Sequence, residues 1–195
     1  IDTITEFRGN SMVRLRTKKM ILNGLMIALV FIATKFTAIQ GPIPPGFVNL
    51  GDAVIIIAAI LFGGRTGMLA GAFGSALADL ASFAYIYIPV TFIVKGLEGL
   101  VIGIVASKIN GSTNLKENRN FLIGLIASII GAFIMIAGYF VAEAYILGFI
   151  DKKLGFTAAV TNLPFNIVQG VASVAVGYSL TLLLIKLNIK KYLNL

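Results

Sequence analysis

Long apolar runs, separated by short polar or glycine- and proline-rich stretches, dominate the chain from Lys19 to Lys186. A helix needs roughly 20 apolar residues to cross a bilayer, and fewer where the membrane thins or a loop covers the helix end. The pattern therefore predicts an all-α fold, an integral membrane bundle of six transmembrane helices. Their expected ranges are Lys19–Ile39, Leu50–Gly63, Thr66–Phe83, Pro89–Ser107, Phe121–Leu147 and Ala158–Lys186.

The breaks between these runs carry the residues that end helices. Gly41–Gly46 contains Pro42, Pro44 and Pro45 and is expected to form a loop rather than a helix. Gly63–Arg65 is expected to form a tight turn, and Asn110–Arg119 a polar connection. The unequal run lengths favour a bundle in which some helices end early and loops close over a cavity.

Composition supports a membrane protein and excludes several kinds of chemistry. Hydrophobic residues make up 58% of the 195 positions, above the share usual for a soluble domain. Cysteine and histidine are both absent, which excludes disulfides, histidine metal sites and Ser–His–Asp or Cys–His catalysis. The chain also contains no Walker A motif, so no ATP binding by that route is expected. We expect neither a metal nor a cofactor.

The polar segment Ile1–Ser11 has no hydrophobic core like that of a signal peptide. We interpret residues 1–11 as a vector-derived tail ahead of a start at Met12, and residues 12–195 as a single six-helix membrane domain.

The basic residues predict the orientation of the chain in the membrane. The net charge is +8, and most lysines and arginines fall in segments that lie on one side of a six-span arrangement. Because basic loops stay in the cytoplasm, both termini are expected there, and the charge suggests no nucleic-acid partner. The basic groups on this side are Arg14, Arg16, Lys18 and Lys19; Arg65; Lys108, Lys116 and Arg119; and Lys186, Lys190 and Lys191.

Polar side chains inside the expected spans gather in the half of the membrane that this topology places outside. Such groups are costly in a bilayer and usually face a cavity or one another. The cytoplasmic halves of the spans are nearly all apolar, so the pattern favours a binding pocket that opens outward over a channel. The polar residues are Lys35, Asn49, Asp52, Asp79, Lys95, Glu98, Glu143, Asn162, Asn166 and Gln169.

Structural roles for individual members of this group remain open. Asp52 and Asp79 could cap helices or pair with lysines, and Lys95 and Glu98 are spaced to pair with each other at i and i+3. The nearby aromatic residues could form an interfacial belt or stack on a flat ring. These aromatics are Phe47, Phe83, Tyr85, Tyr87 and Tyr145.

Small residues recur at spacings that allow close helix packing. Gly67, Gly71 and Gly74 lie along the third expected span, where packing within the chain is the simpler interpretation. Gly24 and Ala28 lie in the first span, whose cytoplasmic half could instead face a partner protein.

Four ordered motifs resemble the S components of energy-coupling factor (ECF) transporters, most of all the branch with riboflavin, hydroxymethylpyrimidine and pyridoxine carriers. The resemblance covers the chain from about Lys19 to its end and is densest between Asn49 and Gly99. The motifs are Phe47-Val-Asn-Leu-Gly-Asp-Ala-Val-Ile, Leu61-Phe-Gly-Gly-Arg-Thr-Gly-Met-Leu-Ala-Gly, Gly74-Ser-Ala-Leu-Ala-Asp79 and Pro89-x-Thr-x-x-Val-Lys95-Gly-x-Glu98-Gly.

The resemblance implies a subunit in a prokaryotic plasma membrane that binds a B vitamin from outside. It also implies a membrane-embedded T subunit and two cytoplasmic ATPases as partners. In the family, a helix-one Ala-x-x-x-Ala motif contacts the T subunit; here Gly24 and Ala28 match it, with glycine in place of the first alanine. The loop with Pro42, Pro44 and Pro45 matches the loop that gates the family's pocket.

We expect riboflavin as the ligand, followed by hydroxymethylpyrimidine or pyridoxine. The candidate substrate-binding residues are Asn49, Asp79, Tyr85, Lys95, Glu98, Glu143, Asn162 and Asn166.

Three alternatives belong to other classes. A stand-alone secondary carrier would transport without partners, but no inverted repeat of broken helices is evident. An intramembrane enzyme would have to rely on Asp79, Lys95 and Glu98, which are the only reactive constellation that the spans offer. A purely structural subunit would leave the polar cluster unexplained.

Overall fold

The computed structural model describes residues 2–40, 42, 47–108 and 118–189, and the side chains within them except those of residues 2–15, 118 and 119. Nearly all of the described chain is helical, which confirms the all-α prediction. The main helices are α1 (Asp2–Phe36), α2 (Gly51–Phe62), α3 (Gly64–Leu69), α4 (Ser75–Ala81), α5 (Ile88–Ala106), α6 (Asn118–Tyr145) and α7 (Phe156–Lys186). Short turns of helix, η2 (Tyr85–Tyr87) and η3 (Leu147–Phe149), precede α5 and follow α6.

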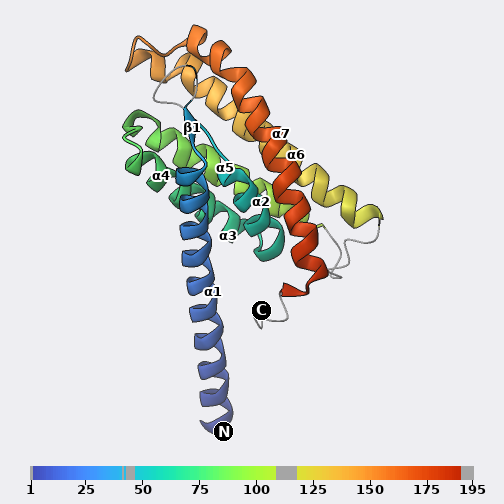
Figure 1. Cartoon of the computed structure of the whole chain (residues 1–195). Coiled ribbons are helices and arrows are strands. Elements are labelled where there is room, and N and C mark those ends of the chain that lie inside the picture. Colours follow the sequence, from blue (N-terminus) through green and yellow to red (C-terminus); the bar gives the residue numbers. More distant parts are fainter. Residues whose placement is uncertain (1, 41, 43–46, 109–117, 190–195) are drawn as a thin grey trace.

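The helices form one bundle in which α5 lies at the centre (Figure 1). Helices α3 and α6 pack against α5, α7 packs against α6 and α2, and α1 packs against α2 and α4. One apolar cluster joins Leu22, Met26 and Val30 of α1 to Ile55 of α2. Helix α1 begins and α7 ends on the same side of the bundle, the lower side in Figure 1.

Each range expected from the apolar pattern contains a helix, although several ends differ. Helix α1 ends at Phe36 rather than Ile39, because the Thr37 hydroxyl donates to the carbonyl oxygen of Ala33 at 2.7 Å and accepts the Leu50 N–H at 2.8 Å. The second bond ties the residue that follows α1 to the segment that enters α2. Within the described residues, four helical segments are long and apolar enough to cross a membrane: Arg16–Phe36, Tyr85–Ala106, Asn120–Phe149 and Phe156–Lys186.

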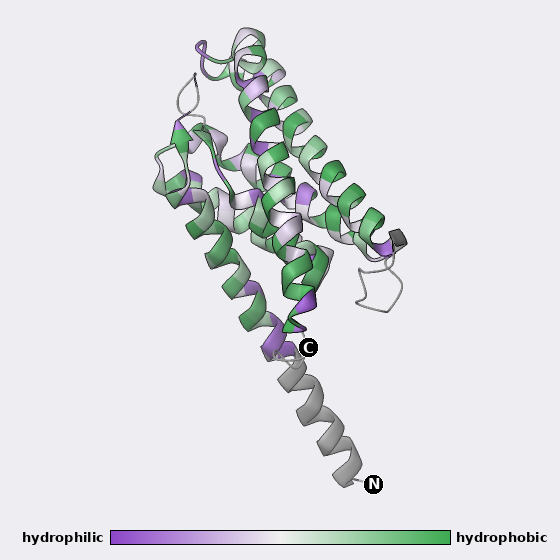
Figure 2. Ribbon diagram, turned by 45° about the vertical axis from the view of Figure 1, so that its right-hand side comes forward, coloured by the Kyte–Doolittle hydropathy of each residue, from purple (hydrophilic) through white to green (hydrophobic). Residues whose placement is uncertain are grey.

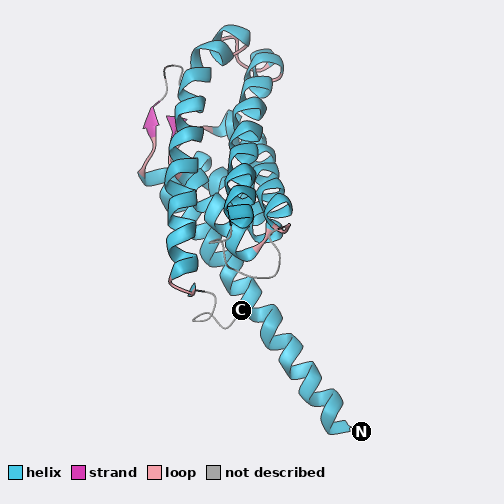
Figure 3. Cartoon of the chain, turned by 90° about the vertical axis from the view of Figure 1, so that its right-hand side faces the viewer, coloured by secondary structure: helices cyan, strands magenta, loops and turns pink. Residues whose placement is uncertain are grey.

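A two-stranded hairpin, which the sequence pattern did not predict, lies at the side of the bundle and contacts α7 (Figure 3). Strands β1 (Ile39–Gln40) and β2 (Phe47–Val48) are antiparallel, with Ile39 opposite Val48 and Gln40 opposite Phe47. Two-residue strands leave no periodic signal to detect. The hairpin flanks the proline-rich stretch; Pro42 is described, whereas Pro44 and Pro45 lie outside the described residues.

A wide π-helical turn, η1 (Ala70–Gly74), interrupts the third expected span between α3 and α4. Such turns insert a residue into the helix and rotate everything that follows. Glycines in this segment allow close approach: a Cβ at Gly67 would lie 2.8 Å from the carbonyl oxygen of Gly99 in α5, and one at Gly74 would lie 2.7 Å from that of Ile27 in α1. The small residues of the third span therefore pack within the chain.

Many large apolar side chains are exposed on the outer faces of the helices. Figure 2 shows the helices coloured mostly green, the colour of hydrophobic residues. Met20 and Leu25 of α1, Phe133 of α6 and Val168 of α7 are among those at least half exposed. A soluble monomer seldom exposes so much contiguous apolar surface. This surface and the apolar helices indicate that the protein resides in a membrane.

Candidate functional site

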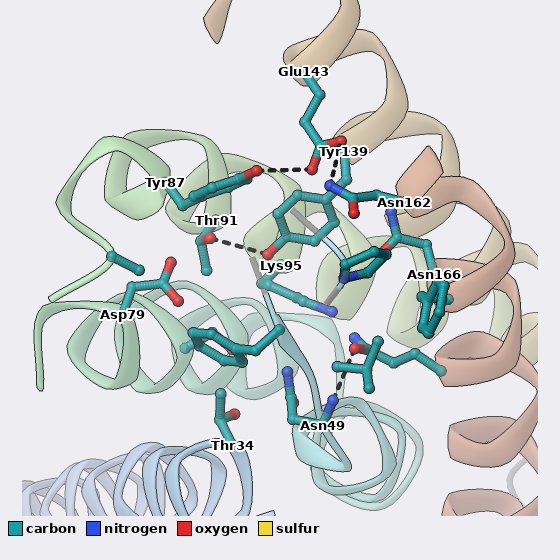
Figure 4. Close-up of a pocket in the computed structure, with 17 residues that line it drawn as sticks. Thr34, Asn49, Asp79, Tyr87, Thr91, Lys95, Tyr139, Glu143, Asn162 and Asn166 are labelled. Atoms are coloured by element: carbon teal, nitrogen blue, oxygen red, sulfur yellow. Dashed lines mark hydrogen bonds between the residues drawn. The ribbon is translucent and has the colours of Figure 1, made fainter. Parts of the chain in front are cut away.

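A pocket lies at the end of the bundle where α1 and α4 end and α5 and α7 begin (Figure 4). It encloses about 590 Å³ of space, counted out to its open mouth. The lining residues are Thr34, Pro42, Phe47, Val48, Asn49, Ser75, Asp79, Ala84, Tyr87, Thr91, Lys95, Tyr139, Glu143, Asn162, Phe165, Asn166 and Gln169.

Most of the candidate residues expected from sequence meet at this pocket. These residues come from five separate segments of the chain. They meet because the end of one helix and the start of the next lie on the same side of the bundle. The lining candidates are Asn49, Asp79, Lys95, Glu143, Asn162 and Asn166. Two others do not line it: Glu98 is fully buried next to Lys95, and Tyr85 is 55% exposed on the outer surface.

A buried ionic cluster forms the floor of the pocket. Lys95 of α5 donates a close, charge-assisted hydrogen bond to Asp52 of α2 and a second one, at 3.3 Å, to Glu98 one turn further along α5. The lysine and the two carboxylates are all almost completely shielded from solvent. The ammonium group also lies 5.5 Å from the ring centroid of Tyr139, within range of a cation–π interaction. The lysine is thus held by three helices.

Gln169 ties this floor to the segment that enters α2. Its side-chain amide donates to Asp52 Oδ2 at 2.9 Å, and its carbonyl oxygen accepts the Asn49 N–H, also at 2.9 Å. The Asn49 side chain in turn accepts the Gly51 N–H at 2.8 Å. The N–H of Gly51, the first residue of α2, is therefore satisfied by a side chain, and the wall beside the hairpin is fixed to α7.

Glu143 of α6 organises the opposite end of the pocket. Figure 4 shows Tyr87 and Asn162 converging on its carboxylate from two sides. The Tyr87 hydroxyl donates to one oxygen at 3.0 Å, and the Asn162 amide donates to the other at 3.1 Å. Beside them, the hydroxyls of Thr91 and Tyr139 share a hydrogen bond of 2.9 Å. These bonds lock the facing surfaces of α5, α6 and α7.

Four lining side chains each carry a buried oxygen that has no hydrogen-bond partner within the described part of the chain. Buried polar atoms are nearly always satisfied, and each exception requires an explanation. These four gather around one cavity, which is what a site for a polar ligand would present, whereas Glu98 and Ser173 carry similar atoms away from the lining. The atoms are Thr34 Oγ1, Ser75 Oγ, Asp79 Oδ2 and Asn162 Oδ1.

Sequence reasoning missed the hydroxyl and aromatic half of the lining. Thr34 and Thr91 gave no signal, because hydroxyl residues are common in apolar helices and often bond their own backbone. Tyr87 and Phe165 could not be separated from exposed aromatics of a membrane interface. A signal does exist for Ser75, since it lies four residues before Asp79 and shares its helix face.

The two remaining expectations concern the proline loop and the first helix. Pro42 lines the pocket, which places the start of the expected gating loop at its mouth. Gly24 and Ala28 lie on the exposed face of α1, and a Cβ at Gly24 would meet nothing within 4 Å. Among the described residues, no group of three or more acidic side chains could hold a metal ion.

Comparison with known proteins agrees with this architecture. Residues 14–186 match the model of the family described as ECF-type riboflavin transporter, S component. A Pyrococcus woesei protein described as uncharacterised, in the gap 3′ region, is 32% identical over 157 residues, which cover 80% of this chain and 95% of that protein. A UPF0397 protein of Lactobacillus helveticus is 29% identical over 126 residues, covering 63% and 68% of the two chains.

A solved structure shares the fold. It is described as the S component of a bacterial ECF transporter, and it superposes with a TM-score of 0.65 at 20% sequence identity, covering 88% of this chain and 98% of its own. The family match spans most of the sequence, including every helix that contributes to the pocket. The chain belongs to the family of ECF-type riboflavin transporter S components, and so is a substrate-binding subunit of an ECF transporter rather than an enzyme.

Proposed function

We propose that this subunit captures a flat, uncharged heteroaromatic B vitamin from outside the cell, with riboflavin as the first choice. The observation that carries the proposal is the group of unpaired buried oxygens that surround the pocket. Aromatic side chains of Phe47, Tyr87, Tyr139 and Phe165 line the same space and offer surfaces for a ring system. The family description favours riboflavin over hydroxymethylpyrimidine and pyridoxine.

The proposed topology has six spans in the plasma membrane of a prokaryote, with both termini in the cytoplasm. The basic residues support this orientation, because Lys108 and Lys186 lie on the side of the bundle away from the pocket, whereas Lys35 is among the few near it. In this arrangement the pocket opens to the outside. The shorter α2 and the interrupted α3–α4 segment form the second and third spans.

Energy for import would come from partners: a membrane T subunit and two cytoplasmic ATPases. The vitamin is cargo, and no cofactor takes part. The exposed face of α1 around Gly24 and Ala28 is the proposed contact with the T subunit, because a small-residue surface lets another helix approach closely.

Substitution of the α1 face should separate capture from import. Ala28→Leu is expected to reduce vitamin uptake by cells that express the whole transporter, while the purified subunit binds vitamin as well as the wild type does. Ala175→Leu, at an exposed position on α7, is the matched control and should leave uptake unchanged. Reduced vitamin binding with intact assembly would show that the α1 face was assigned wrongly.

The identity of the vitamin and the energy source for its import can be tested together. Mass spectrometry of small molecules that co-purify with the subunit should find riboflavin. In liposomes, the subunit alone should not accumulate the vitamin, whereas addition of the T and ATPase subunits with ATP should. Accumulation by the lone chain would identify a secondary carrier and contradict the proposal.

A further inference from the structure

One wall of the pocket, here called the hairpin wall, is formed by β2 and the residue that follows it. Phe47, Val48 and Asn49 all line the pocket, and each of them is only partly buried. A short two-stranded hairpin is at best marginally stable by itself, because it has little packing of its own. The position of the hairpin wall therefore depends on bonds to the neighbouring helices.

Two backbone N–H groups attach the hairpin wall to helices on either side. The Leu50 N–H donates to the Thr37 hydroxyl at 2.8 Å, and that hydroxyl donates in turn to the carbonyl oxygen of Ala33 in α1. The Asn49 N–H donates to the side-chain oxygen of Gln169 in α7 at 2.9 Å. The wall is thus held between the end of α1 and the middle of α7.

Gln169 differs from Thr37 because its other end bonds a side chain of the buried floor. The Gln169 amide nitrogen donates to Asp52 Oδ2 at 2.9 Å, and Asp52 also binds Lys95. A carboxylate accepts and a backbone N–H donates, so a single orientation of the amide satisfies both neighbours. The residue is only 5% exposed, so water competes poorly for either bond. Gln169 therefore forms a short bridge from the floor to the hairpin wall.

Resting on the proposed function, we infer that Gln169 is a positioning residue for capture, which holds the hairpin wall against the pocket and so slows the release of a bound vitamin. Phe165 and Asn166 precede it on α7 and line the pocket as well, so a ligand between α7 and the hairpin wall lies beside the bridge. Movement of the wall away from α7 widens the mouth and breaks the bond between Gln169 and Asn49.

The test follows the release of riboflavin from the purified full chain in detergent, through the regain of flavin fluorescence after dilution. Gln169→Met has nearly the same shape and removes both bonds of the bridge. It should speed release by roughly tenfold without slowing association, because the same bond must break for entry. Ser173→Ala, which changes a buried residue one turn further along α7 and outside the lining, is the matched control and should release at the wild-type rate.

A second variant and a second measurement separate positioning from stability. Gln169→Lys keeps a donor for Asp52 but loses the acceptor for the Asn49 N–H, so it should also speed release. Spin labels at Ile39→Cys on β1 and Thr161→Cys on α7, both exposed positions, report the distance between the hairpin and α7 without any vitamin. The distance distribution should be broader in both variants than in the wild type. A residue that only stabilised the fold would lower the unfolding temperature and leave this distribution unchanged.

Three results would contradict the inference. Wild-type release rates in both variants, or an unchanged distance distribution in a variant that folds, would overturn it and leave the proposed function standing. Fast release with an unchanged distribution would show that Gln169 contacts the vitamin directly and does not position the wall. Absence of riboflavin binding to the wild type would overturn both the inference and the proposed function.

Discussion

At the scale of single residues, Lys95 is the group on which the pocket floor depends. Its ammonium group faces two buried carboxyl groups, and its removal would leave both of them without a cation. Breaking a buried pair by removal of one partner is costly, because the other charge stays in a medium that solvates it poorly. The two acids are therefore expected to respond differently from the lysine.

Lys95→Met should lower the free energy of unfolding by about 3–5 kcal/mol, because Asp52 and Glu98 would be left buried without a cation. Glu98→Gln keeps the Lys95–Asp52 pair and replaces a second buried acid by a neutral amide of the same shape, so it should leave stability unchanged or raise it. Thermal unfolding in detergent, without added vitamin, measures both. Equal losses in the two variants would contradict this view of the cluster.

The sequence identified the acids and amides of the site but not its hydroxyls or its aromatic residues. Asp, Glu, Lys and Asn are conspicuous in an apolar helix because their burial is costly there, so their shared depth predicted a common cavity. Tyr85 and Tyr87 illustrate the limit. They lie two residues apart, yet Tyr85 is exposed and Tyr87 is buried against Glu143, because a turn of 3-10 helix sets their directions.

At the scale of elements, the contact between α3 and α5 depends on the absence of side chains. A Cβ at Gly99 would overlap the backbone of Gly67, whereas one at Gly24 in α1 would meet nothing within 4 Å. The same residue type thus has opposite roles on two helices. The spacing of small residues could be seen in the sequence. The sequence did not show which helix or protein packs against each set of small residues.

Gly99→Ala should destabilise the protein by about 1–3 kcal/mol, because backbone on both sides must move to admit a methyl group. Gly24→Ala is the matched control and should be neutral, or stabilising by up to about 1 kcal/mol through its better helix propensity. Unfolding midpoints of the two variants in the same detergent give the comparison. A Gly99→Ala variant as stable as Gly24→Ala would contradict the close packing of α3 on α5.

Helix positions followed the apolar pattern closely, while helix ends and the hairpin did not. The long helices were predictable because a helix that crosses a bilayer must be apolar over most of its length. The end of α1, in contrast, coincides with hydrogen bonds of Thr37 to Ala33 in its own helix and to the Leu50 N–H thirteen residues further on. The π turn of η1 changes the direction of Ser75 and Asp79, and periodicity in the sequence cannot register one inserted residue.

At the scale of the whole molecule, function follows from an end-to-end asymmetry. The pocket and the buried carboxylates gather where α1 and α6 end and where α2, α5 and α7 begin. The opposite end carries the basic segments. A capture subunit with this asymmetry needs its pocket end outside the cell.

The orientation can be measured directly, because the chain contains no cysteine and each introduced thiol would be the only one. Lys152→Cys, exposed between η3 and α7, should react with a membrane-impermeant maleimide on intact cells. Ser107→Cys, exposed at the end of α5, should react only after the cells are opened. The reverse pattern would place the pocket toward the cytoplasm and contradict uptake from outside.

The most direct measurement is a titration of riboflavin into the purified subunit without ATP, in which binding is monitored by the quenching of flavin fluorescence. The wild type should bind one equivalent with a dissociation constant below about 1 μM, a binding free energy near −8 kcal/mol. Asn166→Trp, which fills the pocket, should abolish binding, and Val168→Trp on the outer face of the same helix should not. Absence of saturable binding to the wild type, or equal binding by the two variants, would contradict capture at this pocket.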